Sequence, residues 1–172
     1  MLIRDARLKD ADAIGALHAS VWTDTYRTLA TPEALAQLDA LHRIAGWQAV
    51  LSDANATTEL IVAEADCQVV GFTAVGPGGH EIFADLGEIK QLYVDQAYQS
   101  AGLGARLMQA AAKRLKARGY SGCGLAVVDG NDRAMAFYQR LGGKDAGGFT
   151  DAGPLWKSKN RLMVWDNIDA LT

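Results

Sequence analysis

Apolar residues recur along this chain with two periods, and each period predicts a different kind of element. Between residues 103 and 115 they return every four positions, which is the spacing of one helical face, and Gly119 stands where such a helix should end. Short runs rich in β-branched residues predict strands at 59–64, 69–75, 88–94 and 123–128. The residues of the helical face are Leu103, Leu107, Ala111 and Leu115.

The first third of the chain is predicted to be a short strand followed by helices. Residues 1–6 are consistent with a strand, and Asp10 is in position to cap a first helix. Thr31-Pro32-Glu33 opens a second helix, because Thr is a good cap and Pro suits the first helical position. A third helical segment is expected over 43–51. The residues of the first helix that should face the core are Ile14, Leu17 and Val21.

The middle of the chain predicts a hairpin that leads into a further strand. Residues 65–68 form a connection short enough to join two antiparallel strands, and the glycine cluster at 76–79 must be a loop. In the strand at 88–94, simple alternation divides the residues between two faces. One face would carry Glu88, Lys90, Leu92 and Val94, and the other Ile89, Gln91 and Tyr93.

The last part of the chain completes a mixed sheet. The run at 123–128 is apolar throughout and is expected to be buried on both faces. A short helix follows at 131–141, and residues 161–166 form a strand that closes a terminal hairpin after a glycine-rich segment. Strands that alternate with helices after a hairpin predict an α/β (α+β) class, with helices on both faces of a mixed sheet.

Length and composition indicate an ordinary globular chain. Its 172 residues suit one domain, residues 1–172, and its longest apolar runs are far below the ~20 residues that cross a bilayer. The N-terminus lacks the apolar segment of a signal peptide, so a cytoplasmic location is expected, with no membrane partner. A net charge of −3 argues against nucleic acid as a partner.

A glycine turn between the strand at 88–94 and the helix at 103–115 is the main candidate binding site. It reads Gln99-Ser100-Ala101-Gly102-Leu103-Gly104, and it directs unpaired N–H groups and the positive end of a helix dipole at whatever lies above it. An anion belongs there, most often a phosphate. The dinucleotide fingerprint fails because Leu107 replaces its third glycine, and the P-loop pattern is absent.

This stretch resembles the Q/R-x-x-G-x-G/A motif of the GNAT superfamily of N-acetyltransferases, through Gln99, Gly102 and Gly104. A second block, made of Asn131, Ala134, Phe137 and Tyr138, is similar to the N-x-x-A-x-x-F-Y helix of that family. One departure is Gly143, which stands where the family often has Phe and so removes a packing residue from the local core.

The resemblance implies a central sheet of about seven strands in which two middle parallel strands splay apart and admit acetyl-CoA as cosubstrate. Here those strands would be 88–94 and 123–128. The pyrophosphate would lie on the backbone amides of the turn, pantetheine along the first splayed strand and beside Asn131, and the thioester sulfur beside Tyr138. The implied cofactor-binding residues are Leu92, Tyr93, Val94, Gln99, Ser100, Ala101, Gly102, Leu103, Gly104, Ala105, Asn131 and Tyr138.

Two side chains are candidates for proton transfer. An amine attacks a thioester only in its neutral form, so Glu88 is the candidate general base, directly or through a water. Its alternative role is a strand carboxylate that is solvated or paired with Lys90. Tyr138 can protonate the departing thiolate of CoA, and its alternative role is aromatic packing beside Phe137.

The acceptor pocket is less well defined by sequence. Trp22 and Tyr26 resemble residues that wall this pocket in many family members, together with Glu88, although a core Trp and a surface Tyr is an equal interpretation. Trp156 and Asn160, near the C-terminus, are candidates for closing it. His18, His42 and His80 show no ligand spacing, so no metal is expected.

The sequence therefore predicts an acetyl-CoA-dependent N-acetyltransferase that transfers acetyl directly to a primary amine of a small molecule or peptide in a ternary complex. A covalent acyl-enzyme is not expected, because the nearest nucleophile, Cys123, lies in a buried strand. The alternative is a catalytically idle domain that binds acyl-CoA and regulates a partner. A homodimer is a family expectation.

Overall fold

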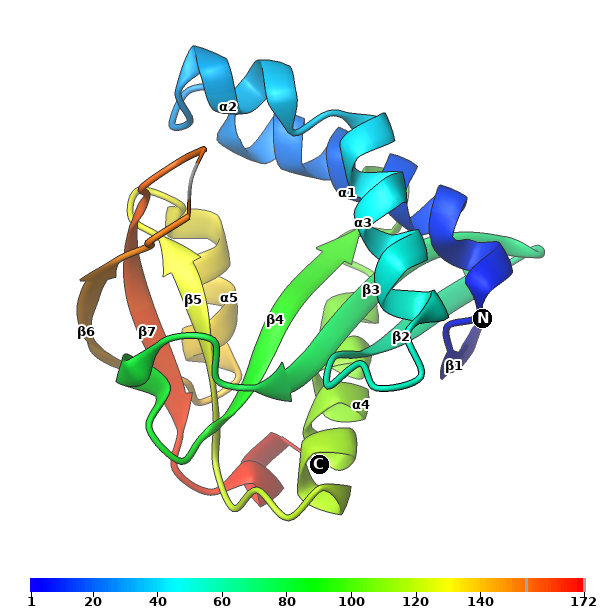
Figure 1. Ribbon diagram of the computed structural model, residues 1–172. Helices are drawn as coiled ribbons and strands as arrows, with labels where there is room; N and C mark the ends of the chain where they lie inside the picture. Colours follow the sequence, from blue (N-terminus) through cyan, green and yellow to red (C-terminus); the bar gives the residue numbers. More distant parts are fainter. Residues whose placement is uncertain (154, 172) are drawn as a thin grey trace.

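The computed structural model describes residues 1–153 and 155–171 and shows one mixed sheet of seven strands (Figure 1). The order across the sheet is β1-β2-β3-β4-β5-β7-β6, and each neighbouring pair is antiparallel except β4 and β5. This confirms the predicted fold class. The strands are β1 (Leu2–Asp5), β2 (Glu59–Ala65), β3 (Gln68–Pro77), β4 (Gly87–Val94), β5 (Cys123–Val128), β6 (Lys144–Thr150) and β7 (Lys159–Trp165).

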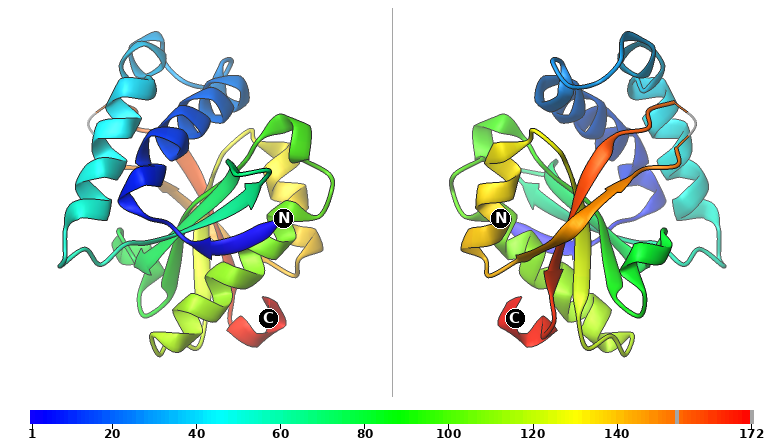
Figure 2. Two further views of the ribbon diagram at one scale, coloured as in Figure 1. Left: turned by 90° about the vertical axis from the view of Figure 1, so that its right-hand side faces the viewer. Right: turned by 90° about the vertical axis from the view of Figure 1, so that its left-hand side faces the viewer.

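Helices cover both faces of the sheet, with α1, α2 and α3 on one side and α4 and α5 on the other (Figure 2). None of the helices in the described residues is long and apolar enough to cross a membrane. The α-helices are α1 (Ala11–Tyr26), α2 (Pro32–Gln37), α3 (Ala40–Ser52), α4 (Leu103–Ala117) and α5 (Asp132–Arg140). Short 3-10 turns lie at Leu8–Asp10, Glu81–Phe83, Gln96–Tyr98 and Ile168–Leu171.

The two parallel strands in the middle of the sheet part soon after they meet. β4 and β5 pair only through Gly87 with Cys123 and Glu88 with Gly124, and beyond these residues they diverge toward their carboxyl ends (Figure 1). Each strand stays paired along its other edge, β4 with β3 and β5 with β7. The expected splay is therefore present, and it leaves a gap at the end of the sheet where α4 begins.

The core lies on both faces of the sheet. The predicted apolar face of α4 is buried. Its Ala111 and Leu115 pack in one cluster with Ile89 and Leu125, and its Leu103 and Leu107 pack in another with Ala63 and Val70. On the opposite face, Ile14 and Leu17 of α1 pack with Phe72 of β3. The absent family Phe is explained by Trp165: a Cβ on Gly143 would lie 2.7 Å from that indole ring, so the tryptophan fills the place.

A β-bulge in β4 makes the simple alternation prediction wrong. β3 pairs Ala74 with Gln91 but Val75 with Ile89, so Lys90 has no partner and the side-chain phase shifts. Ile89 consequently shares the α4 face with Leu92 and Val94. Tyr93 lies on the other face, where its ring centroid is 4.5 Å from that of His18 in α1.

Three smaller predictions also need correction. Asp10 occupies the N-cap of α1, but its carboxylate pairs with Arg4 at 2.7 Å instead of capping the helix. The third helix begins at Ala40, earlier than expected, because Asp39 caps it by accepting a bond from the His42 N–H. Ala126 of β5 is exposed, so this strand is not buried on both faces.

Candidate active site

A cavity of about 480 Å³ occupies the gap between the splayed strands. Its walls come from the carboxyl halves of β4 and β5, the turn before α4, one side of α5 and the end of α1. The residues of the two strands that line it are Ile89, Lys90, Gln91, Leu92, Tyr93, Val94, Leu125, Ala126 and Val127. The splay thus leaves, in the centre of the sheet, one edge of β4 and one edge of β5 without a neighbouring strand.

The turn before α4 presents a row of free backbone donors to this cavity. Ser100 and Gly102 have positive φ values of 65° and 79°, and the first helical bond runs from the Arg106 N–H to the Gly102 carbonyl. The amides of residues 100–105 donate to no acceptor in the described part of the chain. Of these residues, Ser100, Gly102, Gly104 and Ala105 line the cavity. Adjacent free N–H groups at a helix N-terminus are the kind of concavity that suits an anion.

Gln99 holds this turn in place. Its side-chain amide donates to the Val94 carbonyl at 2.9 Å, and its backbone N–H donates to the Gln96 carbonyl at 3.3 Å. The backbone N–H of Gln99 therefore already has an acceptor, unlike the backbone N–H groups of Ser100 to Ala105. Of the site residues expected to supply amides, Gln99 shapes the concavity and the six that follow it carry the free donors.

The glycines of the turn serve two separate needs. Gly102 is in the left-handed region, and a Cβ there would meet no atom within 4 Å, so the backbone shape requires glycine and the space above is open. At Gly104, a Cβ would lie 3.1 Å from the Phe137 ring of α5. This glycine lets α5 approach the start of α4, which brings Asn131 and Tyr138 to the cavity wall.

Three tyrosines from different elements line the cavity: Tyr26, Tyr93 and Tyr138. Burial raises the pKa of all three phenols, so they are protonated across the neutral range. The neighbouring Asn131 side chain offsets part of this increase in the pKa of Tyr26. Tyr138 packs edge-on against Phe137 and Trp165, which fixes its ring while one edge faces the cavity.

Glu88 lies at the base of the splay and does not line the cavity, whereas Lys90 does. The Oε2 atom of Glu88 accepts hydrogen bonds from the Lys90 ammonium and from the Gly79 N–H, both at 2.8 Å. The pairing that sequence offered as the alternative role is thus present. Oε1 has no partner among the described residues, so one oxygen remains free to take a proton.

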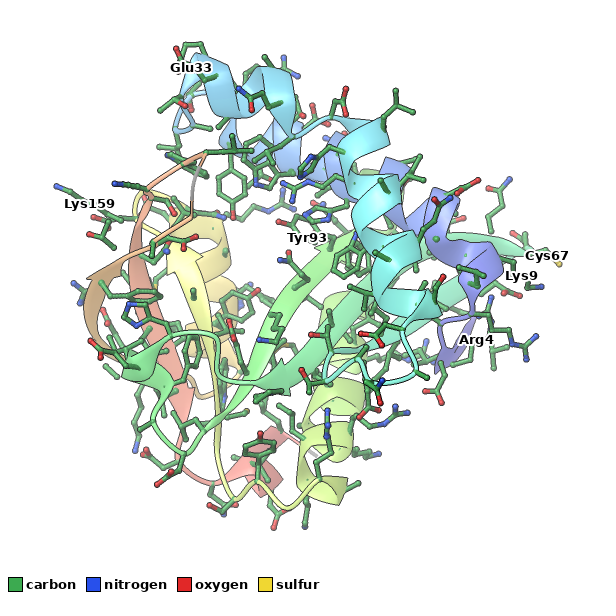
Figure 3. The ribbon with its side chains drawn as sticks, viewed as in Figure 1. Arg4, Lys9, Glu33, Cys67, Tyr93 and Lys159 are labelled. Atoms are coloured by element: carbon green, nitrogen blue, oxygen red, sulfur yellow. The ribbon has the colours of Figure 1, made fainter. Side chains whose placement is uncertain are left out.

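An aromatic group closes the end of the cavity nearest α1. The ring centroids of Trp22, Tyr26 and Trp156 lie 5.4 to 5.8 Å apart. Tyr26 lines the cavity, and the buried Trp22 packs behind it. Tyr93, at the carboxyl end of β4, lies beneath α1 and α3 in the same region (Figure 3).

A comparison with protein-family models shows which family has this sequence pattern. Residues 16–143 match the model of the acetyltransferase (GNAT) family. The chain belongs to this family. Both splayed strands, the glycine turn and all of α4 and α5 fall inside the matched range.

Solved GNAT structures share the complete fold at low sequence identity. The PaiA N-acetyltransferase of Thermoplasma acidophilum, in complex with coenzyme A, has a TM-score of 0.71 and 22% identity over 95% of this chain and 96% of that chain. The ribosomal-protein-alanine N-acetyltransferase of Brucella melitensis has a TM-score of 0.69 and 23% identity over 96% and 99%. YncA of Salmonella typhimurium, a putative acetyltransferase with its cofactor acetyl-CoA, has a TM-score of 0.71 and 20% identity over 98% and 94%.

Other chemistry has little support in this GNAT domain. Burial raises the pKa of Cys123 to about 12, so its thiol is a poor nucleophile near neutral pH. The described residues contain no cluster of three or more His, Cys, Asp or Glu that could hold a metal. His18 is buried, its Nδ1 accepts from the Trp47 indole at 3.1 Å, and burial lowers its pKa to about 3.

Sequence reasoning missed Arg43, which it treated only as the start of a helix. The guanidinium carbon lies 5.4 Å from the centroid of the Trp22 ring, at the aromatic end of the site. No local pattern marks this residue, because α3 reaches the site only through the packing of α3 on α1.

Proposed function

We propose that this GNAT protein transfers the acetyl group of acetyl-CoA to a primary amine in a ternary complex. The observation that carries the proposal is the row of six free amides, from Ser100 to Ala105, at the mouth of the gap between β4 and β5. The Thermoplasma and Salmonella proteins of similar fold were crystallised with coenzyme A and acetyl-CoA, which supports the same carrier here.

The carrier would bind in three parts along the cavity. Its pyrophosphate takes the amides of the turn, where the positive end of the α4 dipole also acts on it. Its pantetheine arm enters the gap, where Leu92 to Val94 have no β5 partner for their backbone groups. Asn131 lines the cavity and caps α5 by accepting from the Ala134 N–H at 3.2 Å, and it would lie beside the same arm.

The reaction needs one nucleophile and two proton transfers. The neutral amine attacks the thioester carbonyl, the N–C bond forms, and the C–S bond breaks with its electrons going to sulfur. Tyr138 gives its phenolic proton to that sulfur. Its raised pKa keeps the donor protonated at neutral pH and also makes it a weaker acid than an ordinary tyrosine. The packing against Phe137 and Trp165 holds its orientation.

Glu88 is the proposed acceptor of the amine proton. Lys90 and the Gly79 N–H both bind Oε2, so the proton would go to Oε1 through a water that bridges from the cavity. Because the carboxylate lies outside the cavity lining, a direct contact with the acceptor is not part of this proposal. Trp22 and Tyr26 form the proposed wall of the acceptor pocket.

Two measurements on the purified protein test this function. Calorimetry with coenzyme A should give saturable binding, and thiol detection of CoA release should respond to some primary amines in a panel supplied with acetyl-CoA. Binding without release for every amine would instead favour the idle acyl-CoA-binding domain. Absence of binding would contradict both readings.

A further inference from the structure

Among the residues that the structure describes, one half-buried arginine has no carboxylate partner. Four arginines of the described residues are half-buried as whole residues, and three of them form ion pairs. Arg4 pairs with Asp10 and Glu64, Arg114 with Asp5 and Glu59, and Arg161 with Asp145. Arg43 forms no ion pair or hydrogen bond with the described residues, and its Nε is fully buried without an acceptor.

The surroundings of Arg43 are aromatic and adjoin the end of the cavity that Tyr26 lines, and Arg43 itself lies behind that lining. Its guanidinium lies against the ring of Trp22, which packs with Tyr26 and Trp156. The aromatic face attracts the positive charge, but it supplies no acceptor atom for the N–H groups. Burial lowers the pKa of Arg43, yet a guanidinium remains charged at neutral pH.

The positive charge of Arg43 acts on a residue of the cavity wall. Tyr93, which lines it, and His18, which stacks on Tyr93, both lie within electrostatic range of Arg43. His18 is neutral near pH 7, so Arg43 is the charged group of this aromatic cluster. An isolated, half-buried guanidinium is costly unless an anion completes its hydrogen bonds.

We propose that Arg43 binds a carboxylate of the acceptor, so that this protein acetylates amines that also carry an acid group. The inference rests on the proposed function and names its substrate class. A carboxylate offers two coplanar oxygens that match the guanidinium fork, and its single charge is balanced by one arginine. Polyamines are disfavoured, because a second cation would lie near Arg43 in a site poor in water.

Matched substrate pairs test this directly. Amino acids and their carboxamides, which differ only in the acid group, are compared as acceptors by CoA release at saturating acetyl-CoA. We expect the acids to have a kcat/KM about 30-fold or more above that of the amides. In Arg43→Met this preference should disappear through a higher KM for the acids, while Arg43→Lys should retain part of it.

A control and a stability measurement separate binding from folding. Arg27→Met removes an arginine that is exposed and pairs with Asp24 on the last turns of α1, and it should leave the acid preference unchanged. Without acceptor, Arg43→Met should melt at the same temperature as the wild type or higher, because it removes an unsatisfied donor. A purely structural Arg43 would give a lower melting temperature.

The outcomes are distinguishable. Amides or polyamines used as well as acids by the wild type, or an acid preference that survives in Arg43→Met, would overturn the role of Arg43 and leave the acetyltransfer proposal intact. No CoA release with any amine, although calorimetry detects coenzyme A binding, would overturn the proposed function and this inference with it.

Discussion

The two ends of the active-site cavity are built in different ways. The end proposed to hold the carrier comes from one continuous stretch, β4 to α5, in which the turn at 99–105 is held by local bonds from Gln99. The end proposed to bind the acceptor is assembled from α1, α3 and Trp156, which meet only in the folded chain. A local site leaves a sequence motif, whereas a site made by tertiary packing does not, and acceptor specificity belongs to the second kind.

The largest expected effect is at the carrier end. Gly102→Val places a β-branched residue at a φ of 79° and a side chain in the space above the amides. We expect the Kd for coenzyme A to rise about 10³-fold or more, because several charge-assisted hydrogen bonds are lost together. Calorimetry measures this change.

Gly119→Val is the matched control for that variant. Gly119 also has a positive φ, 93°, and open space around its Cβ position, but it lies at the far end of α4. Similar backbone strain is therefore introduced away from the cavity. If both variants lost coenzyme A binding equally, backbone strain would explain the result, and the loss could not be assigned to the amides of residues 100–105.

The next effect concerns the proton donor. Tyr138→Phe should lower kcat about 10³-fold and leave the Kd for coenzyme A unchanged, since only the hydroxyl is removed. Tyr120→Phe is the control and should keep full activity. Tyr120 is a partly buried tyrosine that packs against the same core cluster as Tyr138. A normal rate of acetyl transfer by Tyr138→Phe in a single turnover would exclude this role.

The pH profile sharpens the same assignment. Burial disfavours the phenolate, so the pKa of Tyr138 lies well above its ordinary value of ~10. The donor therefore stays protonated as the pH rises, and the kcat of the wild type should not decrease between about pH 7 and 10 through loss of this proton. A decrease in that range that vanished in Tyr138→Phe would show a more acidic phenol than the structure implies.

A smaller effect is expected at the base of the splay. Glu88→Gln should lower kcat about 10²-fold if Oε1 receives the amine proton, and it should not affect coenzyme A binding. Glu81→Gln, an exposed carboxylate in the neighbouring 3-10 turn, serves as control. An unchanged kcat and pH–rate profile would assign Glu88 to the Lys90 ion pair alone.

The smallest effect is on stability at the acceptor end. The pKa of His18 is about 3 in the folded protein and ~6.5 in an unfolded chain, so below pH 6.5 only the unfolded state gains this proton. Stability is then lost as the pH falls from about 6.5 toward 3. Between pH 7 and 5.5, the free energy of unfolding measured with urea should decrease by about 1 kcal/mol more in the wild type than in His18→Asn.

The asparagine variant keeps an acceptor for the Trp47 indole, so the comparison isolates the titration from the hydrogen bond. Equal losses of stability in the two proteins would mean that His18 titrates in the folded state much as it does when unfolded. The packing of His18 against Tyr93 would then be looser than the ring distance of 4.5 Å indicates.

Sequence was sufficient for the elements whose cause is local. The four-residue period of α4, the Thr31 cap and the glycine turn depend on neighbours in the chain, and each is present in the structure. The bulge at Lys90 was not predictable, because it arises from how β3 and β4 pair. For the same reason the faces of β4 were assigned incorrectly, and the fixing of Glu88 by the Gly79 loop was not foreseen.

Charged residues show the same limit. Aspartate is a favourable residue at a helix N-cap, yet the Asp10 carboxylate forms an ion pair with Arg4 and does not cap α1. Arg43 looks in the sequence like an ordinary helical surface arginine. Only the packing of α3 over Trp22 reveals that its Nε is buried without an acceptor among the described residues.

A crystal structure of the protein with coenzyme A tests the central claim most directly. We predict pyrophosphate oxygens about 3 Å from the amide nitrogens between Ser100 and Ala105, with pantetheine running between β4 and β5. Coenzyme A bound elsewhere on the molecule, with those amides facing only solvent, would contradict the account.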